Sequence, residues 1–123
     1  MKQRFISKGL AQIMRYFALA GLIFLATPAY AVSTVTATWY GNELAGNRTA
    51  SGEIFNPNGL TAAHRSLPFG TCLHVSNPRT GKSVKVRVND RGPFTRGVSL
   101  DLSAGAARAI GMRSTQPVTM KRC

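Results

Sequence analysis

Acidic residues are scarce in this sequence. Only four of its 123 residues are Asp or Glu, against sixteen Lys and Arg, which gives a formal net charge of +12. A site built from carboxylates must therefore draw on Glu43, Glu53, Asp90 and Asp101. The strong positive field favours anionic partners, unless it serves only to keep a small protein soluble.

Cysteine and histidine are almost as rare, with two residues of each. Together with the scattered acids they show no spacing typical of a metal site. The sequence also has neither a glycine-rich phosphate loop nor a serine nucleophile elbow. We therefore expect no metal and no cofactor, and the enzyme classes defined by those two motifs are excluded.

No apolar run is long enough to span a membrane, which takes about 20 residues. The main one, residues 16–26, follows a start whose only charges are positive and precedes Ala29-Tyr30-Ala31. A basic start, a short apolar stretch and an A-x-A end are the three parts of a secretory signal peptide. We expect residues 1–31 to be this signal and to be cleaved after Ala31; an uncleaved anchor is the alternative.

Residues 32–123 would then form one small basic domain, either periplasmic or secreted. Its net charge is +8, because four of the sixteen basic residues lie in the signal. No cysteine near the cut offers an attachment point for lipid, so we expect no stable membrane anchor after cleavage, and a monomer. The compartment argues against nucleic acid as a partner and favours polyanions of the cell envelope, such as cell-wall glycans.

Export makes a disulfide between the two cysteines, Cys72 and Cys123, the favoured prediction. A domain of this size buries only about 60–65% of its unfolded surface, so its core is marginal. In an oxidising compartment a disulfide is favoured over the alternative of two free buried thiols. Closing a loop of 51 residues would contribute roughly 4 kcal/mol on the chain-entropy model.

Hydrophobic alternation predicts many short strands. The clearest strand carries Val84, Val86 and Val88 on one face. We expect strands over 32–40, 71–76, 83–89, 97–102 and 116–122, a hairpin connection over 77–81, a helical turn over 61–64, and one helix over 104–110 between a Ser103 cap and a Gly111 stop. Such a chain is typical of a small mixed barrel, closed to protect its strand edges.

Asp90 is the acid best placed for chemistry. It continues the parity of Val84, Val86 and Val88, so we expect its carboxyl group on the covered side at the end of the strand. Desolvation there would raise its pKa, whereas the neighbouring Arg91 would lower it. The alternative is a turn aspartate that accepts backbone N–H bonds.

The other candidates each have a structural alternative. Asp101 lies on the outward parity near the expected helix start, where its charge would favour the helix. Glu53 lies in a glycine-rich loop, and His64 could donate to a substrate oxygen or be structural. Trp39 and Tyr40 could stack on a sugar ring or belong to the core.

Several motifs occur in a familiar order: Ala37-Thr38-Trp39-Tyr40-Gly41, Thr49-Ala50-Ser51-Gly52-Glu53, Leu60-Thr61-Ala62-Ala63-His64, Leu67-Pro68-Phe69-Gly70-Thr71, Val86-Arg87-Val88-Asn89-Asp90-Arg91-Gly92-Pro93-Phe94 and Asp101-Leu102-Ser103. With them, residues 35–120 resemble the rare lipoprotein A (RlpA) family of lytic transglycosylases. The resemblance implies a mainly β fold, a small six-stranded double-psi β-barrel with one or two short helices, related to expansins.

The resemblance also implies an activity and a site. Lytic transglycosylases cut the β-1,4 bond between N-acetylmuramic acid and N-acetylglucosamine without water and leave a 1,6-anhydro end; this family prefers peptidoglycan strands stripped of stem peptides. The family's Glu, His and Asp correspond to Glu53, His64 and Asp90, at intervals of eleven and twenty-six residues. We expect Asp90 to act as acid and then base, with Asp101 as the reserve candidate. His64 and Glu53 would orient the sugar or tune Asp90, and Trp39, Tyr40 and Arg91 would contact the substrate.

Two features of the family are not found in this sequence: a lipobox and a C-terminal glycan-binding repeat. Septal targeting by that repeat therefore does not carry over. Two alternatives to an enzyme remain: a non-catalytic, expansin-like module that binds or loosens wall polysaccharide, and an inhibitor or effector on the same scaffold.

Overall fold

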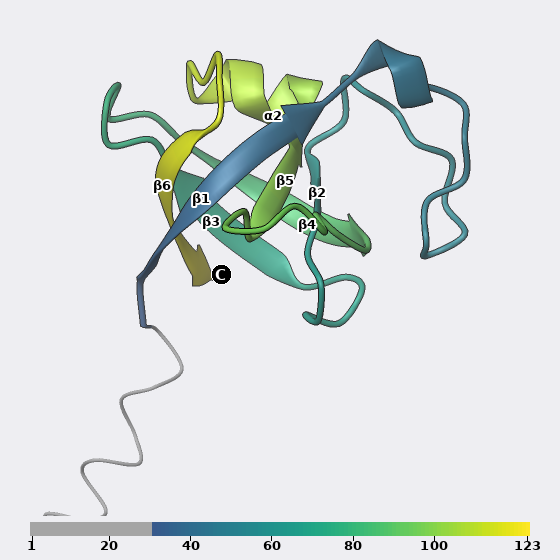
Figure 1. Cartoon of the computed structure of the whole chain (residues 1–123), viewed down its shortest axis with the longest axis horizontal. Helices are drawn as coiled ribbons and strands as arrows, with labels where there is room; N and C mark the ends of the chain where they lie inside the picture. Colours follow the sequence, from purple (N-terminus) through teal and green to yellow (C-terminus); the bar gives the residue numbers. More distant parts are fainter. Residues whose placement is uncertain (1–30) are drawn as a thin grey trace, which may run out of the picture. The chain divides into compact units, whose positions relative to one another are not determined.

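The computed structural model describes residues 31–123, so the signal peptide expected over 1–31 falls outside the described residues except for its last position. The described chain forms six strands that close into a barrel (Figure 1). They are β1 (Ser33–Tyr40), β2 (Thr61–Ala63), β3 (Cys72–Ser76), β4 (Ser83–Asp90), β5 (Leu100–Ser103) and β6 (Gln116–Arg122). The predicted mainly β, closed six-stranded barrel is confirmed.

The order of strands around the barrel is β1-β5-β2-β4-β3-β6. The pairs β1–β5 and β2–β4 are parallel, and the other pairs are antiparallel. Parallel neighbours cannot be joined by a tight hairpin, so long connections cross between them. The segment between β1 and β2, two strands separated in the barrel by β5, carries the 3₁₀ turn η2 (Asn42–Leu44) and lies beside the barrel, on the right in Figure 1.

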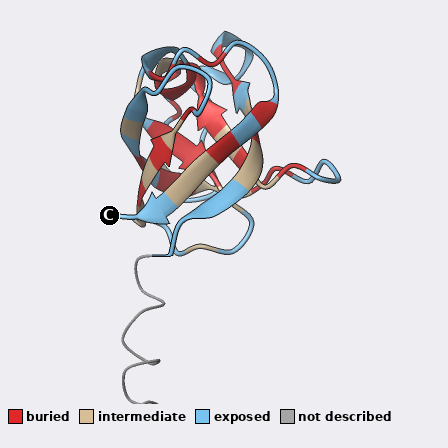
Figure 2. Ribbon diagram, turned by 90° about the vertical axis from the view of Figure 1, so that its left-hand side faces the viewer, coloured by how far each residue is buried: buried red, intermediate tan, exposed pale blue. Residues whose placement is uncertain are grey.

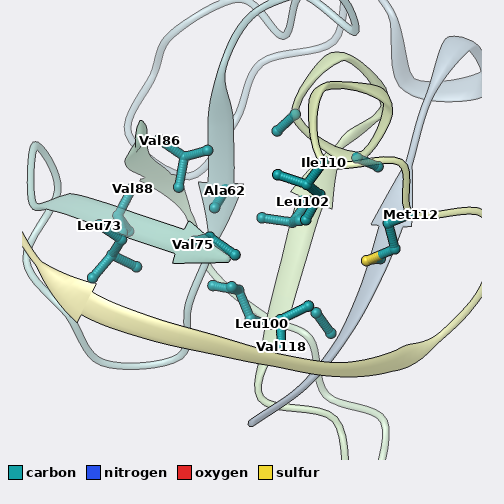
Figure 3. Packing of buried hydrophobic residues seen from close by; sticks show 13 residues of the cluster. Ala62, Leu73, Val75, Val86, Val88, Leu100, Leu102, Ile110, Met112 and Val118 are labelled. Atoms are coloured by element: carbon teal, nitrogen blue, oxygen red, sulfur yellow. The ribbon is translucent and has the colours of Figure 1, made fainter. Parts of the chain in front are cut away.

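Alternating apolar residues fill the barrel, as the burial colours of Figure 2 and the side chains of Figure 3 show. Val86 and Val88 are buried while Lys85 and Arg87 between and beside them are exposed, because a strand directs successive side chains to opposite faces. The labelled core residues are Ala62, Leu73, Val75, Val86, Val88, Leu100, Leu102, Ile110, Met112 and Val118.

One helix, α2 (Ala104–Ala109), closes an end of this core. Ser103 caps it by accepting a hydrogen bond from the Ala106 N–H, which satisfies one of the free donors of the first turn. Gly111, at φ +67°, follows its end. Both the cap and the stop were predicted.

Two predicted elements were wrong in part. Residues 61–64 do not form a helical turn: Thr61–Ala63 is strand β2, which pairs with both β4 and β5. Pairing on both edges overrides the helical preference of the two alanines. Strand β5 begins at Leu100 rather than 97, because a turn closed by the Val98 N–H on the Thr95 carbonyl precedes it.

The predicted disulfide is present between Cys72 and Cys123, 51 residues apart. The Cys123 N–H also donates to the Cys72 carbonyl at 3.0 Å. The chain end after β6 is therefore fixed to the start of β3. Within residues 31–123, no helix has the length and apolarity that a membrane span requires.

A second, smaller apolar cluster lies on the outer face of the barrel. Tyr40 and Phe55 stack with ring centroids 4.6 Å apart, and Ala63 of β2 completes the cluster. The β1–β2 segment thereby covers part of the outer face of β1, β5 and β2, and this cover shapes the site described next.

Candidate active site

Two carboxylates lie in one row across three neighbouring strands. Asp90 of β4 pairs with Ala63 of β2, and Ala63 pairs with Asp101 of β5. Neighbouring strands are about 4.8 Å apart, which places the two aspartate backbones roughly 10 Å apart with one strand between them. Ala63 belongs to the outer apolar cluster, so both aspartates face the outside of the barrel.

A β-bulge brings Asp90 into this row. The register shifts between Ala62, which pairs with Val88, and Ala63, which pairs with Asp90, so that Asn89 is an additional residue. Our expectation that Asp90 shares the inward parity of the valines was therefore wrong. The extra residue reverses the alternation, as bulges beside active sites commonly do.

Asp101 has the most perturbed carboxyl group of the site. Burial raises its pKa to about 7, and the nearby negative charges of Asp90 and Glu43 add to the shift. Its Oδ1 atom is buried without a hydrogen-bond partner among the described residues. The helix that follows is not among the causes of this shift, which burial dominates.

Tyr40 belongs to the core of the outer cluster rather than to a sugar-binding surface. Its side chain is buried against Phe55, so the predicted stacking on a sugar ring has no free face. Burial raises the pKa of its hydroxyl, and the negative charges of Asp90 and Asp101 raise it further. Tyr40 therefore remains a neutral phenol that desolvates the carboxylates.

Glu43 was missed at the level of the sequence. Its Oε1 atom accepts a hydrogen bond from the Gly41 N–H at 3.1 Å, which lowers the pKa of Glu43 and fixes its charge near Asp101. The available signal was its position two residues after the Trp39-Tyr40-Gly41 motif. Two of the four acids, Glu43 and Asp90, thus act on a third, Asp101.

Backbone donors fix Asp90. Its Oδ1 atom accepts hydrogen bonds from the N–H groups of Ala50 at 2.9 Å and Arg91 at 2.8 Å. The turn role that the sequence left open is therefore real. The same contact attaches the loop before Glu53 to the end of β4, while the His64 N–H donates to the Asp90 carbonyl at 3.2 Å. The loop of Glu53, the backbone of His64 and Asp90 thus meet at one place.

Glu53 forms a bidentate ion pair with Arg87, with distances of 2.6 and 2.7 Å. The hydrogen bond from Arg87 lowers the pKa of Glu53, and the Asn89 side chain adds to this effect. Glu53 is therefore ionised at neutral pH and suits the role of hydrogen-bond acceptor rather than that of proton donor.

His64 is fixed in one tautomer. Its Nδ1 atom accepts hydrogen bonds from the N–H groups of Ser66 and Leu67, both at 3.1 Å, so the neutral ring carries its proton on Nε2. Burial lowers the pKa of His64, and the surrounding arginines lower it further. The ring therefore presents an N–H donor, as the sequence suggested it could.

Arg91 builds the loop that carries His64. Its Nη1 atom donates to the carbonyls of His64 at 3.2 Å and Leu67 at 2.8 Å, and its guanidinium carbon lies 3.9 Å from the ring centre of Phe69. We expected Arg91 to contact substrate; the structure shows that its guanidinium group supports the loop that positions His64.

Among residues 31–123 three aromatic side chains are exposed, namely Trp39, Phe94 and the Phe69 ring beside Arg91. Trp39 points to the face opposite Tyr40, beside α2, and is 43% exposed. Phe94, which was missed, is 80% exposed; a Cβ on Gly92 would lie 3.7 Å from its ring. The Phe94 ring therefore lies beside Gly92, two residues along the chain from Asp90.

The closed barrel, its two parallel strand pairs and the carboxylate row outside it define a double-psi β-barrel domain with a candidate active site of acids and a histidine. A family model described as lytic transglycolase matches residues 32–121. The chain belongs to this lytic transglycolase family, and the resemblance to the RlpA family is thereby confirmed.

Curated relatives support the assignment. A probable endolytic peptidoglycan transglycosylase RlpA of Synechocystis is 66% identical over 79 residues, covering 64% of this chain and 25% of that protein. The endolytic peptidoglycan transglycosylase RlpA of Campylobacter jejuni is 40% identical over 119 residues, covering 94% of this chain and 43% of that protein. The chain thus spans less than half the length of these relatives.

Solved structures agree with the fold. An expansin of Clavibacter michiganensis has a TM-score of 0.57 at 25% identity, covering 76% of this chain and 50% of that one. A Streptomyces papain inhibitor has a TM-score of 0.59 at 20% identity, covering 77% of this chain and 96% of that one. At that identity the second likeness concerns the fold alone.

Proposed function

We propose that this domain is a peptidoglycan lytic transglycosylase, which cleaves the β-1,4 bond between N-acetylmuramic acid and N-acetylglucosamine and leaves a 1,6-anhydro end. The observation that carries the proposal is the carboxylate row. Asp101, with a pKa raised to about 7, can hold a proton near neutral pH beside the second acid, Asp90. A carboxyl group whose pKa is raised by burial is the usual general acid of glycosidases.

In the first step the Asp101 carboxyl group donates its proton to the glycosidic oxygen, and the bond from that oxygen to C1 of muramic acid breaks. Positive charge develops on the sugar ring. The carboxylate of Asp90, on the other side of β2 and fixed by two backbone N–H groups, stabilises this charge. Our sequence-based assignment gave the acid–base role to Asp90; the present proposal gives it to Asp101, and the raised pKa of Asp101 supports this choice.

In the second step the C6 hydroxyl group of the same muramic acid attacks C1, and its proton returns to the Asp101 carboxylate. A bond forms within the sugar, no water is consumed, and the acid is regenerated. One carboxyl group thus serves twice, which suits a domain with few acids.

The histidine and the remaining glutamate orient the strand. The Nε2–H group of His64 donates to a sugar oxygen, and the ionised Glu53, fixed by Arg87, accepts from a sugar hydroxyl group. Neither side chain changes protonation state in this scheme.

We propose that the protein acts outside the cytoplasm, because its substrate class is cell-wall peptidoglycan. Cleavage of the signal after Ala31 would release residues 32–123 as a periplasmic or secreted monomer. The family model begins at residue 32, which is in keeping with that boundary.

The test is mass spectrometry of peptide-free glycan strands after incubation with wild type, Asp101→Asn and Asp90→Asn. We expect anhydro products from wild type and a fall of about 10²-fold or more in Asp101→Asn. Asp90→Asn should also be slow, but its remaining activity should decline at a lower pH than wild type, because loss of a negative neighbour lowers the pKa of Asp101.

Full activity in a folded Asp101→Asn protein, with none in Asp90→Asn, would restore Asp90 as the acid. If wild type binds strands but forms no product, the proposed activity is wrong and the expansin-like binding module takes its place.

A further inference from the structure

A shallow pocket of about 160 Å³ lies beside α2, on the face opposite Tyr40. Trp39, Ala104, Ala107, Arg108 and Met112 line it. Pockets that enclose whole ligands hold roughly 300–1,000 Å³, so this one suits a single sugar unit of a longer chain. The two alanines leave the space open, and the indole supplies a flat apolar wall.

Both functional side chains of the pocket are held in place by neighbours. The indole N–H of Trp39 donates to the Arg113 carbonyl at 3.2 Å. The Nη2 atom of Arg108 donates to the Asn58 side chain at 2.8 Å, which leaves other guanidinium donors for a ligand. An aromatic wall with a fixed cation at its rim matches a sugar that bears a carboxylate.

The pocket adjoins the carboxylate row. A Cβ on Gly41 would lie 3.4 Å from the Trp39 ring, 3.4 Å from Ala104 and 3.7 Å from the Glu43 carboxylate. Glu43 in turn acts electrostatically on Asp101. A saccharide chain lying over Asp101 can therefore reach the pocket within a few sugar units.

We propose that this pocket binds a muramic acid unit with a free lactyl group, its ring against the Trp39 indole and its lactyl carboxylate on the Arg108 guanidinium. The proposal rests on the proposed peptidoglycan substrate and adds a specificity site to it. In strands that carry stem peptides the lactyl carboxyl group is an amide and has no charge. Arg108 thus distinguishes peptide-free from peptide-bearing strands.

The test is calorimetric binding at 150 mM salt, with every variant made in the Asp101→Asn protein so that turnover does not interfere. The probes are a peptide-free peptidoglycan tetrasaccharide and chitotetraose, which has the same glycosidic linkage but no carboxylate. Arg108→Gln should lower the affinity for the tetrasaccharide about tenfold or more and leave the affinity for chitotetraose unchanged. Trp39→Ala should lower the affinity for both probes, and Trp39→Phe should restore part of that affinity.

Lys85→Gln is the matched control, because it removes one exposed positive charge on β4 and should leave both probes unchanged. The proposal would be overturned if Arg108→Gln bound the tetrasaccharide as tightly as its parent, or if it lost affinity for both probes equally. Product formation by wild type is measured separately. Anhydro products without this affinity change would contradict the pocket alone, whereas the affinity change without any products would contradict the proposed activity alone.

Discussion

Asp101 and Tyr40 show how a few buried atoms define the chemistry of this site. The hydroxyl oxygen of Tyr40 and the Oδ1 atom of Asp101 are both buried without a hydrogen-bond partner among the described residues. Unpaired buried polar atoms reduce stability and recur at functional sites. The sequence could identify Asp101 as a candidate, but its desolvation depends on a ring stacked on Phe55 from a distant segment.

The raised pKa of Asp101 predicts how stability depends on pH. From about pH 4 to about pH 7 the unfolded chain is ionised at this position while the folded protein keeps the proton, so wild type loses stability as pH rises through that window. Asp101→Asn cannot ionise and should melt higher than wild type at pH 8, with the advantage disappearing near pH 4. A constant difference in melting temperature across this range contradicts the assignment.

His64 offers a spectroscopic test of the site. Nitrogen-detected NMR at pH 7 should show a neutral ring with its proton on Nε2, and the titration midpoint should lie below 6.5 because burial lowers the pKa. A proton on Nδ1, or a midpoint above 6.5, would contradict the donor role proposed for this residue.

At the scale of elements, periodicity predicted β1, β3, β4, β6 and α2 to within about two residues of their observed bounds. It failed where pairing decides the outcome. Strand β2 is three residues long and owes its conformation to two neighbours, and the bulge at Asn89 depends on the register against β2. No local pattern encodes either feature, so the outward direction of Asp90 could not be foreseen.

Helix α2 provides a prediction that opposes local propensity. Gly105→Ala in an exposed helix interior would stabilise a protein by about 1 kcal/mol. Here the added Cβ would lie 2.7 Å from the Asn58 carbonyl oxygen, so we expect a lower melting temperature and, through Asn58, a displaced Arg108. The control Ala109→Gly, at an exposed position, should lower stability only by the difference in helix propensity between alanine and glycine. A stabilised Gly105→Ala protein would show that the 57–59 segment moves freely.

Across the whole molecule, a positively charged surface surrounds a small acidic centre. Glu43 and Asp90 both act on Asp101, and Glu53 is paired with Arg87. The composition predicted the basic surface, whereas the meeting of acids from the β1–β2 segment, β4 and β5 required the closed barrel. The basic surface would thus attract anionic glycan, while the acidic centre of the same small domain would transfer the proton.

The disulfide should account for much of the stability of this domain. Constraint of a 51-residue loop contributes roughly 4 kcal/mol, and each 1 kcal/mol shifts the melting temperature of a domain this size by about 4–8 °C. Reduction, or the double replacement of Cys72 and Cys123 by Ala, should therefore lower the melting temperature by roughly 20 °C. Two alkylatable thiols in natively exported protein would contradict the bridge.

The most direct test of the central claim is mass spectrometry of peptide-free peptidoglycan strands digested in water enriched in ¹⁸O. A lytic transglycosylase closes the sugar on its own C6 hydroxyl group, so wild type should give 1,6-anhydro ends that contain no ¹⁸O, and Asp101→Asn should give almost none. New reducing ends that carry ¹⁸O would reveal hydrolysis, and the absence of any cleavage by wild type would reveal a binding protein. Either result would contradict the account.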